Sequence, residues 1–256
     1  LAARDRHVFA ALMLAHGHGD GLVTGATRKN AHVLAQIGQV FDLRPQNGAV
    51  GITGVLHKGR VVLIGDTLVH EWPEAEDLAD IATRGAHVAR GLGLDPRVAF
   101  LSFSNFGYPI SERAIKMAEA PEVLDARGVD FEYEGEMTVD VALNMDAAAR
   151  YPFSRLTGPA NVLVVPARHS ASISVKLMQE MAGATGIGPI LTGVPKPILS
   201  PVQKREQAAR RTAAALGYNE CVTYSFVDKA AATIFGGGDD ATMLANPISS
   251  EMSHMR

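Results

Sequence analysis

Apolar residues in the first 190 positions alternate between short continuous runs and longer stretches with helical spacing. Continuous apolar runs within residues 97–102 and 161–165 predict strands, as expected where both faces of a strand are buried. Stretches such as 74–92 and 170–181 carry apolar side chains three and four positions apart, which predicts helices. This alternation predicts an α/β fold with a doubly wound, mostly parallel sheet.

The opening residues follow the same pattern with shorter elements. Residues 8–14 predict a helix and 21–24 a short strand, and a second helix begins near Asn30. Two further apolar runs, 50–56 and 61–64, are joined by a short turn that contains glycine, which is typical of a β-hairpin. We place this antiparallel pair at an edge of the sheet.

A row of acidic residues runs along the predicted strand 129–134 and just past its end. Glu132, Glu134 and Glu136 alternate, so in a strand they would face the same side. Such a row is either a solvated face or a site that holds a base or a metal, and we interpret it as a solvated face. A helix over 138–149 is predicted next.

The stretch 192–201 interrupts the alternation. Pro195, Pro197 and Pro201 remove backbone donors and fix φ, which argues against a helix or a central strand here. The stretch is either a linker or the turn between a last strand and a helix that starts at Pro201. We take 196–202 as a seam between two domains.

Composition narrows the class of protein. The chain has 256 residues, of which 47% are apolar, enough for a sizeable core. No apolar run approaches the roughly 18 residues of a membrane span, and no signal segment opens the chain, so we expect a cytoplasmic protein with no membrane partner. A net charge of −3 gives no general attraction to nucleic acid, and the single Cys221 excludes an internal disulfide.

Two polar turns follow predicted strands, where ligands of doubly wound sheets bind. Thr24, Thr27 and Arg28 precede a helix and suit a phosphate or carboxylate, although an ordinary capped turn has the same composition. Ser104 and Asn105 follow the run 97–102 and can donate to a ligand, or simply cap a turn.

Other candidate sites have simpler explanations. Lys176 and Arg168 flank a helix start and can meet an anion, but we interpret both as surface cations. His16, His18 and Asp20 are close in sequence, but their spacing does not match a zinc motif, so we expect no metal.

Four segments of the chain resemble the phosphate acetyltransferase family, in the order and with the spacing of that family. They are RVAFLSFSNFG at 97–107, DFEYEGEM at 130–137, LTGPANVL at 156–163 and IGPILTG at 187–193. The sequence FEYEGEM, together with HSASIS at 169–174, is similar to the version of the domain that is fused to bacterial NADP-dependent malic enzymes. The resemblance covers nearly all of residues 1–195.

The resemblance implies a two-lobed α/β domain, with an incomplete N-terminal lobe here, and a cleft for coenzyme A and an acyl phosphate. Carried over by position, the anion-binding turn is Thr24 to Arg28 and the second loop is Ser104–Asn105. In malic enzymes the domain is thought to bind acetyl-CoA as a regulator. The implied ligand is therefore acetyl-CoA or a related CoA or phosphate compound, with no tightly bound cofactor, and the implied assembly is a homo-oligomer.

This chain departs from active members of the family in ways that affect catalysis. Thr67 stands where active members commonly have Cys, and Ala35 where they have Arg. After Lys196 and Pro197, active members continue into a Ser-Arg-Gly segment and an Asp that supply catalytic groups. Here residues 198–201 are Ile, Leu, Ser and Pro. We therefore expect no catalytic residues and no acetyl transfer, with an active phosphate acetyltransferase as the alternative.

The end of the chain resembles a different protein. AALGYNECVTYSFVD at 214–228 and NPISSEMSHMR at 246–256 are similar to the β subunit of bacterial phenylalanyl-tRNA synthetase. This implies a small α+β fragment of a class II synthetase-like core over 203–256, with a helix at 203–216. It would meet a synthetase α subunit only if it were complete. A role in translation is thus the third hypothesis, and we interpret the chain as a chimera of two fragments.

Overall fold

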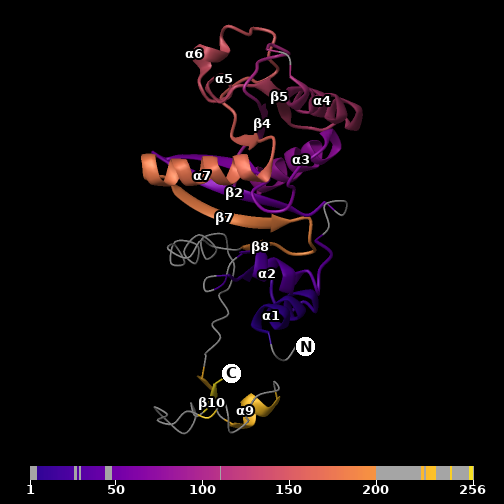
Figure 1. Ribbon diagram of the computed structural model, residues 1–256, viewed down its shortest axis with the longest axis vertical. Helices are drawn as coiled ribbons and strands as arrows, with labels where there is room; N and C mark the ends of the chain where they lie inside the picture. Colours follow the sequence, from indigo (N-terminus) through magenta and orange to yellow (C-terminus); the bar gives the residue numbers. More distant parts are fainter. Residues whose placement is uncertain are drawn as a thin grey trace.

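The computed structural model describes residues 5–25, 28, 30–43, 48–109, 111–199, 226–227, 229–234, 243 and 254–255. Its main feature is an eight-stranded sheet with the order β1-β8-β7-β2-β3-β6-β4-β5 (Figure 1). The strands are β1 (Leu22–Val23), β2 (Val50–His57), β3 (Arg60–Gly65), β4 (Arg97–Leu101), β5 (Glu132–Met137), β6 (Val162–Val164), β7 (Thr185–Thr192) and β8 (Ile198–Leu199).

The sheet is mixed, with parallel pairs in the majority. The pairs β1–β8, β3–β6, β4–β6 and β4–β5 are parallel, whereas β2–β3, β2–β7 and β7–β8 are antiparallel. The strands β3, β6, β4 and β5 form a continuous parallel half, so their carboxyl ends and the loops that follow lie at one edge. The α/β fold predicted from the alternation of elements is confirmed.

The predicted hairpin is present, but its predicted place at a sheet edge is wrong. β2 and β3 occupy the fourth and fifth positions of the eight-stranded order. β2 pairs with β7 on its other side, and its first six residues are buried. An antiparallel pair that is covered on both faces belongs in the interior of a sheet, because its apolar side chains need neighbours on every side.

Helices cover both faces of the sheet. They are α1 (Arg6–Ala15), α2 (Asn30–Ile37), α3 (Ala75–Gly91), α4 (Glu112–Arg127), α5 (Val139–Leu143), α6 (Met145–Ala148) and α7 (Arg168–Ala182). Along β4, Val98 and Phe100 pack in one core with α3 and α4, whereas Ala99 and Leu101 pack in a second core with α5, α6 and α7. This alternation explains the continuous apolar run of β4, because both of its faces are buried.

A third core lies where α1 and α2 meet the β1–β8 end of the sheet. Leu14 of α1, Ile37 of α2, Leu191 of β7 and Ile198 of β8 are all buried there. Figure 1 shows α1 and α2 close to β8, and β4 and β5 at the far end of the sheet.

The predicted helix over 138–149 is two helices. α5 ends at Leu143, and Asn144 starts α6 by accepting a hydrogen bond from the Asp146 N–H at 2.9 Å through its side chain. A residue whose side chain caps a new helix interrupts the one before it. The strand predicted over 129–134 is likewise displaced, since β5 begins at Glu132.

The Pro-rich seam contains a strand. β8 follows Pro197 directly and lies between β1 and β7, parallel to the first and antiparallel to the second. Leu22 N–H donates to the Pro197 carbonyl at 3.0 Å, and Thr24 N–H donates to the Leu199 carbonyl at 2.9 Å. The expectation that no central strand runs here is wrong, because two residues between prolines retain enough donors and acceptors to pair.

Little of the C-terminal segment is described. β9 (Phe226–Val227) pairs antiparallel with β10 (His254–Met255), and α9 (Lys229–Ile234) lies between them in sequence. The predicted helix 203–216 lies outside the described residues. Among the helices that the structure describes, none has the length and apolar character of a membrane span.

Candidate functional site

The loop after β3 is organised around a buried carboxylate, Asp66. Its Oδ1 accepts hydrogen bonds from the N–H groups of Gly51 at 2.9 Å and Leu68 at 2.7 Å. Its Oδ2 accepts from the His70 N–H at 2.7 Å, and Val69 N–H reaches both oxygens at 3.1 Å. One aspartate therefore satisfies four backbone donors and fixes the course of the loop.

His70 completes this arrangement. Its Nδ1 lies 2.7 Å from Asp66 Oδ2, its Nε2 lies 3.8 Å from Asp77 Oδ1, and the residue is only 4% exposed. Burial of His70 opposes protonation, but the hydrogen bond and charge of Asp66, with Asp77 and Asp80 nearby, raise the pKa of the imidazole above its ordinary value. The loop is thus anchored by a buried ion pair when His70 is protonated.

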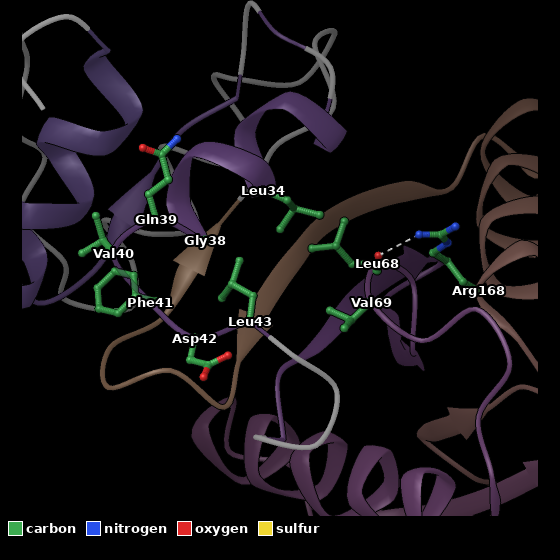
Figure 2. A pocket seen from close by; sticks show the side chains of 10 residues that line it. All are labelled: Leu34, Gly38, Gln39, Val40, Phe41, Asp42, Leu43, Leu68, Val69 and Arg168. Carbon is green, nitrogen blue, oxygen red and sulfur yellow. Dashed lines mark hydrogen bonds between the residues drawn. The ribbon is translucent and has the colours of Figure 1, made fainter. Parts of the chain in front are cut away.

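A cleft of about 740 Å³ opens beside this loop (Figure 2). One wall is the end of α2 and the turn after it, and the other is formed by Leu68, Val69 and the start of α7. The lining is Leu34, Gly38, Gln39, Val40, Phe41, Asp42, Leu43, Leu68, Val69 and Arg168. Most of these side chains are apolar, so the cleft suits an elongated ligand that is largely uncharged along its length.

A smaller hollow of about 330 Å³ adjoins the cleft and shares Leu34, Leu68 and Arg168 with it. It adds Thr67, His169 and Ser172 to the lining. This hollow is the more polar part of the cleft and can take the hydrogen-bonding end of a ligand.

Arg168 lines both spaces, and Figure 2 shows its side chain beside Leu68 in the larger one. Its Nη1 donates to the Leu68 carbonyl at 3.4 Å, its backbone N–H donates to the His70 carbonyl at 3.2 Å, and its Nη2 lies 3.7 Å from Glu71 Oε2. It is also the first residue of α7, whose first turn contains no acidic residue. A guanidinium at a helix N-terminus makes this the positive point of the cleft and a place for an anionic group.

The predicted anion-binding turn lies elsewhere. The Thr24 hydroxyl is 2.6 Å from His7 Nδ1, and Arg28 is exposed. Thr27 lies outside the described residues. Neither Thr24 nor Arg28 lines the cleft.

The second predicted loop is held by internal hydrogen bonds. Ser104 is fully buried and donates to Glu136 Oε1 at 2.7 Å, while Asn105 Oδ1 accepts from the Thr138 N–H at 2.8 Å. Lys176 is exposed on α7 and lines neither space.

The described chain does not bring the predicted residues into one site. Five strands separate β1, which precedes Thr24, from β4, which precedes Ser104. Six neighbouring spacings of about 4.8 Å place these strands on the order of 29 Å apart.

The interpretation of the acidic row as a solvated face is wrong. Glu134 is 7% and Glu136 only 1% exposed. Glu134 Oε2 accepts the Arg155 N–H at 2.9 Å, and Glu136 Oε1 also accepts the Gly107 N–H at 2.9 Å. Both carboxylates hold loops together, and among the described residues no group of three or more His, Cys, Asp or Glu side chains is arranged to hold a metal ion.

Sequence reasoning missed Asp66 and gave Arg168 only a secondary place. Only their positions in the sequence could have indicated a role. Asp66 directly follows β3, and Arg168 begins α7 four residues after the end of β6. Adjacent parallel strands bring such residues to the same edge. The order of the strands was needed to connect them, and the sequence did not specify it.

Comparison with known proteins places these observations in two families. Residues 2–213 match the family described as phosphate acetyl/butaryl transferase, and residues 191–256 match the phenylalanyl tRNA synthetase beta chain CLM domain. The two matches overlap over 191–213, which includes β8 and the whole Pro-rich seam.

Curated relatives exist for both parts. The chain is 47% identical over 216 residues to an NADP-dependent malic enzyme of Rhizobium meliloti (strain 1021), covering 84% of this chain and 28% of that enzyme. It is 75% identical over 64 residues to the phenylalanine–tRNA ligase beta subunit of Cereibacter sphaeroides, covering 25% of this chain and 8% of that subunit. The chain thus spans only a small part of either relative.

Solved structures agree with the first match. A phosphotransacetylase from Streptococcus pyogenes superposes with a TM-score of 0.71 at 28% identity, covering 83% of this chain and 68% of that one. EutD phosphotransacetylase from Staphylococcus aureus gives a TM-score of 0.68 at 28% identity, covering 77% and 62%. The chain belongs to the phosphate acetyl/butaryl transferase family, and its last residues are a segment of the phenylalanyl-tRNA synthetase β-chain type.

Proposed function

We propose that residues 1–195 form a regulatory domain of the malic-enzyme type, which binds acetyl-CoA or a related CoA or phosphate compound without transferring its acetyl group. The observation that carries this proposal is the chemistry at the seam. After Lys196 and Pro197, the resemblance implies a Ser-Arg-Gly segment and an Asp in members with transferase activity. This chain continues instead with Ile198, Leu199, Ser200 and Pro201, of which Ile198 and Leu199 form β8. Ile198 is 1% exposed and packed in the third core, so the position offers no charged group to a ligand.

The binding half of the proposal is supported by the cleft beside Asp66. Its volume of about 740 Å³ is within the usual range for small-molecule sites. A CoA ester is an elongated ligand with a weakly polar arm and several phosphates. The apolar wall of Leu34, Phe41 and Leu68 suits the arm, and Arg168 at the start of α7 suits a phosphate.

Phosphate acetyl transfer remains the alternative, because the family description and the similar solved structures are of transferases. It differs from the regulatory proposal in one outcome, the formation of acetyl phosphate from acetyl-CoA and phosphate. A role in translation has less support, since the synthetase-like segment spans 8% of the β subunit it resembles. Binding of a synthetase α subunit would require the rest of that subunit.

The test combines binding and turnover on the full chain. We expect saturable binding of acetyl-CoA by calorimetry and no acetyl phosphate above background. Arg168→Met should weaken binding about tenfold, the loss of one charge-assisted contact. Arg150→Met is the matched control, because this exposed cation lies away from the cleft, 3.8 Å from Asp140. Acetyl phosphate formation, or equal affinity of both variants and the parent, would contradict the proposal.

We also propose that the domain self-associates in the cytoplasm. Ile173, Leu177 and Met181 recur every four residues on α7 and are 62%, 55% and 81% exposed. An apolar stripe of this kind on a helix favours contact with another protein surface. We propose that a second copy of the domain packs against this stripe in the homo-oligomer.

A further inference from the structure

Trp72 is an exposed aromatic residue on a fixed stretch of backbone beside the smaller hollow. The residue is 64% exposed. Two positions before it, the His70 carbonyl accepts a hydrogen bond from the Arg168 N–H at 3.2 Å. Two positions after it, the Glu74 N–H donates to Asp77 Oδ2 at 2.9 Å. The backbone is therefore held on both sides of Trp72, while its indole ring is open to solvent.

The ring of His169 packs against this indole. The two ring centroids lie 5.6 Å apart, and the ring planes are tilted by 59°. Tilted pairs at this separation are favourable for aromatic rings, and no third ring fits between them. His169 is the second residue of α7 and lines the smaller hollow. The imidazole thus restrains the indole at the rim of the hollow and leaves most of the indole surface open.

The hollow also offers polar residues and a cation. Thr67 and Ser172 line it together with His169, and Arg168 lines both the hollow and the larger cleft. Arg168 Nη2 lies 3.7 Å from Glu71 Oε2, but both side chains are more than a third exposed, so this pair is weak and an anionic ligand can replace Glu71. An open aromatic face beside a guanidinium suits a nucleotide, whose base stacks and whose phosphates pair with arginine.

The order of these features matches the order of the parts of a CoA compound. Such a compound has an adenine base at one end, phosphates next to it and a weakly polar arm beyond them. Trp72 and His169 lie at the rim of the hollow, Arg168 is shared by the two spaces, and the larger cleft continues with apolar residues such as Leu34 and Leu68. One ligand can therefore meet all three environments in turn.

We propose that Trp72 forms the stacking site for the adenine base of a nucleotide ligand, which in the proposed CoA compound is the adenosine end. The inference rests on the proposed function and adds the residue that recognises this end. Exposure of an aromatic ring is not sufficient for such a role. Phe103 is 62% exposed, but it lines neither space.

The first test uses the intrinsic fluorescence of the full chain. Trp72 is its single tryptophan, so the emission reports on this site alone. We expect adenosine 3′,5′-bisphosphate, the nucleotide end of CoA, to quench the emission saturably, because a base stacked on indole quenches it. S-acetylpantetheine, the arm alone, should leave the emission unchanged. Absence of quenching by the bisphosphate, or equal quenching by the two compounds, would overturn the inference.

The second test measures binding of acetyl-CoA by calorimetry. Trp72→Ala should weaken it about tenfold, the usual size of one lost base–aromatic contact. Trp72→Phe keeps an aromatic face and should bind within about threefold of the parent. Phe103→Ala is the matched control and should bind like the parent. Because both replaced side chains are exposed, all three variants should keep the unfolding temperature of the parent.

The remaining outcomes separate this inference from the proposed function. If the parent binds acetyl-CoA and Trp72→Ala binds it equally well, the inference is wrong and the proposed function stands. Equal losses in Trp72→Ala and Phe103→Ala also contradict the inference. If the bisphosphate quenches Trp72 saturably but the parent does not bind acetyl-CoA, the nucleotide site is supported and the proposed function is wrong.

Discussion

Replacing Asp66 tests whether a single carboxylate organises the loop that forms one wall of the cleft. Asp66→Ala removes the acceptor for the N–H groups of Gly51, Leu68, Val69 and His70, together with the partner of the His70 ring. Each buried donor left unpaired costs about 1–3 kcal/mol, but water can enter and the loop can relax, so the losses do not add. Removing one member of a buried ion pair costs about 3–5 kcal/mol, and we expect a loss in this range.

The assay is urea unfolding followed by the fluorescence of Trp72, the single tryptophan of the chain. Its ring centroid lies 5.6 Å from that of His169, and the two rings are tilted by 59°. Asp66→Asn keeps one acceptor oxygen and should lose about half as much. Asp80→Ala is the surface control: Asp80 pairs with Arg127 at 2.7 Å, but both side chains are more than a third exposed, so we expect less than about 1 kcal/mol.

The reasoning fails if Asp66→Ala and Asp80→Ala lose similar free energy of unfolding. It also fails if Asp66→Ala leaves the Trp72 emission and the hydrogen exchange of the loop unchanged. Either result would mean that packing of Leu68 and Val69, rather than the carboxylate, holds the loop in place.

Three other predictions concern different parts of the fold. The pKa of His70 is raised in the folded state, so its contribution to stability is complete below its unfolded pKa and is lost as pH rises through the folded value. The melting temperature of the parent relative to His70→Gln should therefore fall as pH rises above the unfolded pKa of about 6.5. Gly193→Ala should destabilise the chain by about 2–4 kcal/mol in urea, since φ is +77° and the new Cβ would lie 1.9 Å from the Gly48 carbonyl oxygen. Leu177→Lys should shift the sedimentation coefficient toward that of a monomer, because a charge would enter the exposed stripe of α7.

Each of these has a contrary result. A parent-minus-variant difference that rises with pH would mean that His70 is neutral in the fold. A Gly193→Ala chain as stable as the parent would show that the turn before β8 is not required. Unchanged sedimentation of Leu177→Lys would place any self-association on another surface.

The sequence predicted those parts of the fold that local patterns control. Apolar patterns identify β4, β6, α3 and α7. A strand buried on both faces has a continuous apolar run, and a helix buried on one stripe has apolar residues three and four positions apart. The break at Asn144 could not be seen, since an asparagine can either cap a helix or lie exposed on one. The place of the β2–β3 hairpin depends on β7, which comes more than 100 residues later.

The candidate site was harder to predict because its residues act through distant partners. In the sequence, Glu136 looks like one residue of an exposed acidic row. Only the fold brings the Ser104 hydroxyl and the Gly107 N–H to its carboxylate. Asp66 is a common type of residue at a common place, and only the four N–H groups around it reveal its role. The strand at the seam was missed because proline lacks only a backbone N–H donor. The carbonyl groups of this stretch can still accept hydrogen bonds, and those of Pro197 and Leu199 accept from the N–H groups of Leu22 and Thr24.

Equilibrium dialysis of the full chain against labelled acetyl-CoA and phosphate tests the central claim most directly, because it reports binding and conversion together. The account predicts saturable retention of label, all of which is recovered as intact acetyl-CoA. Label recovered as acetyl phosphate, or no retention at concentrations that saturate family members, would contradict it.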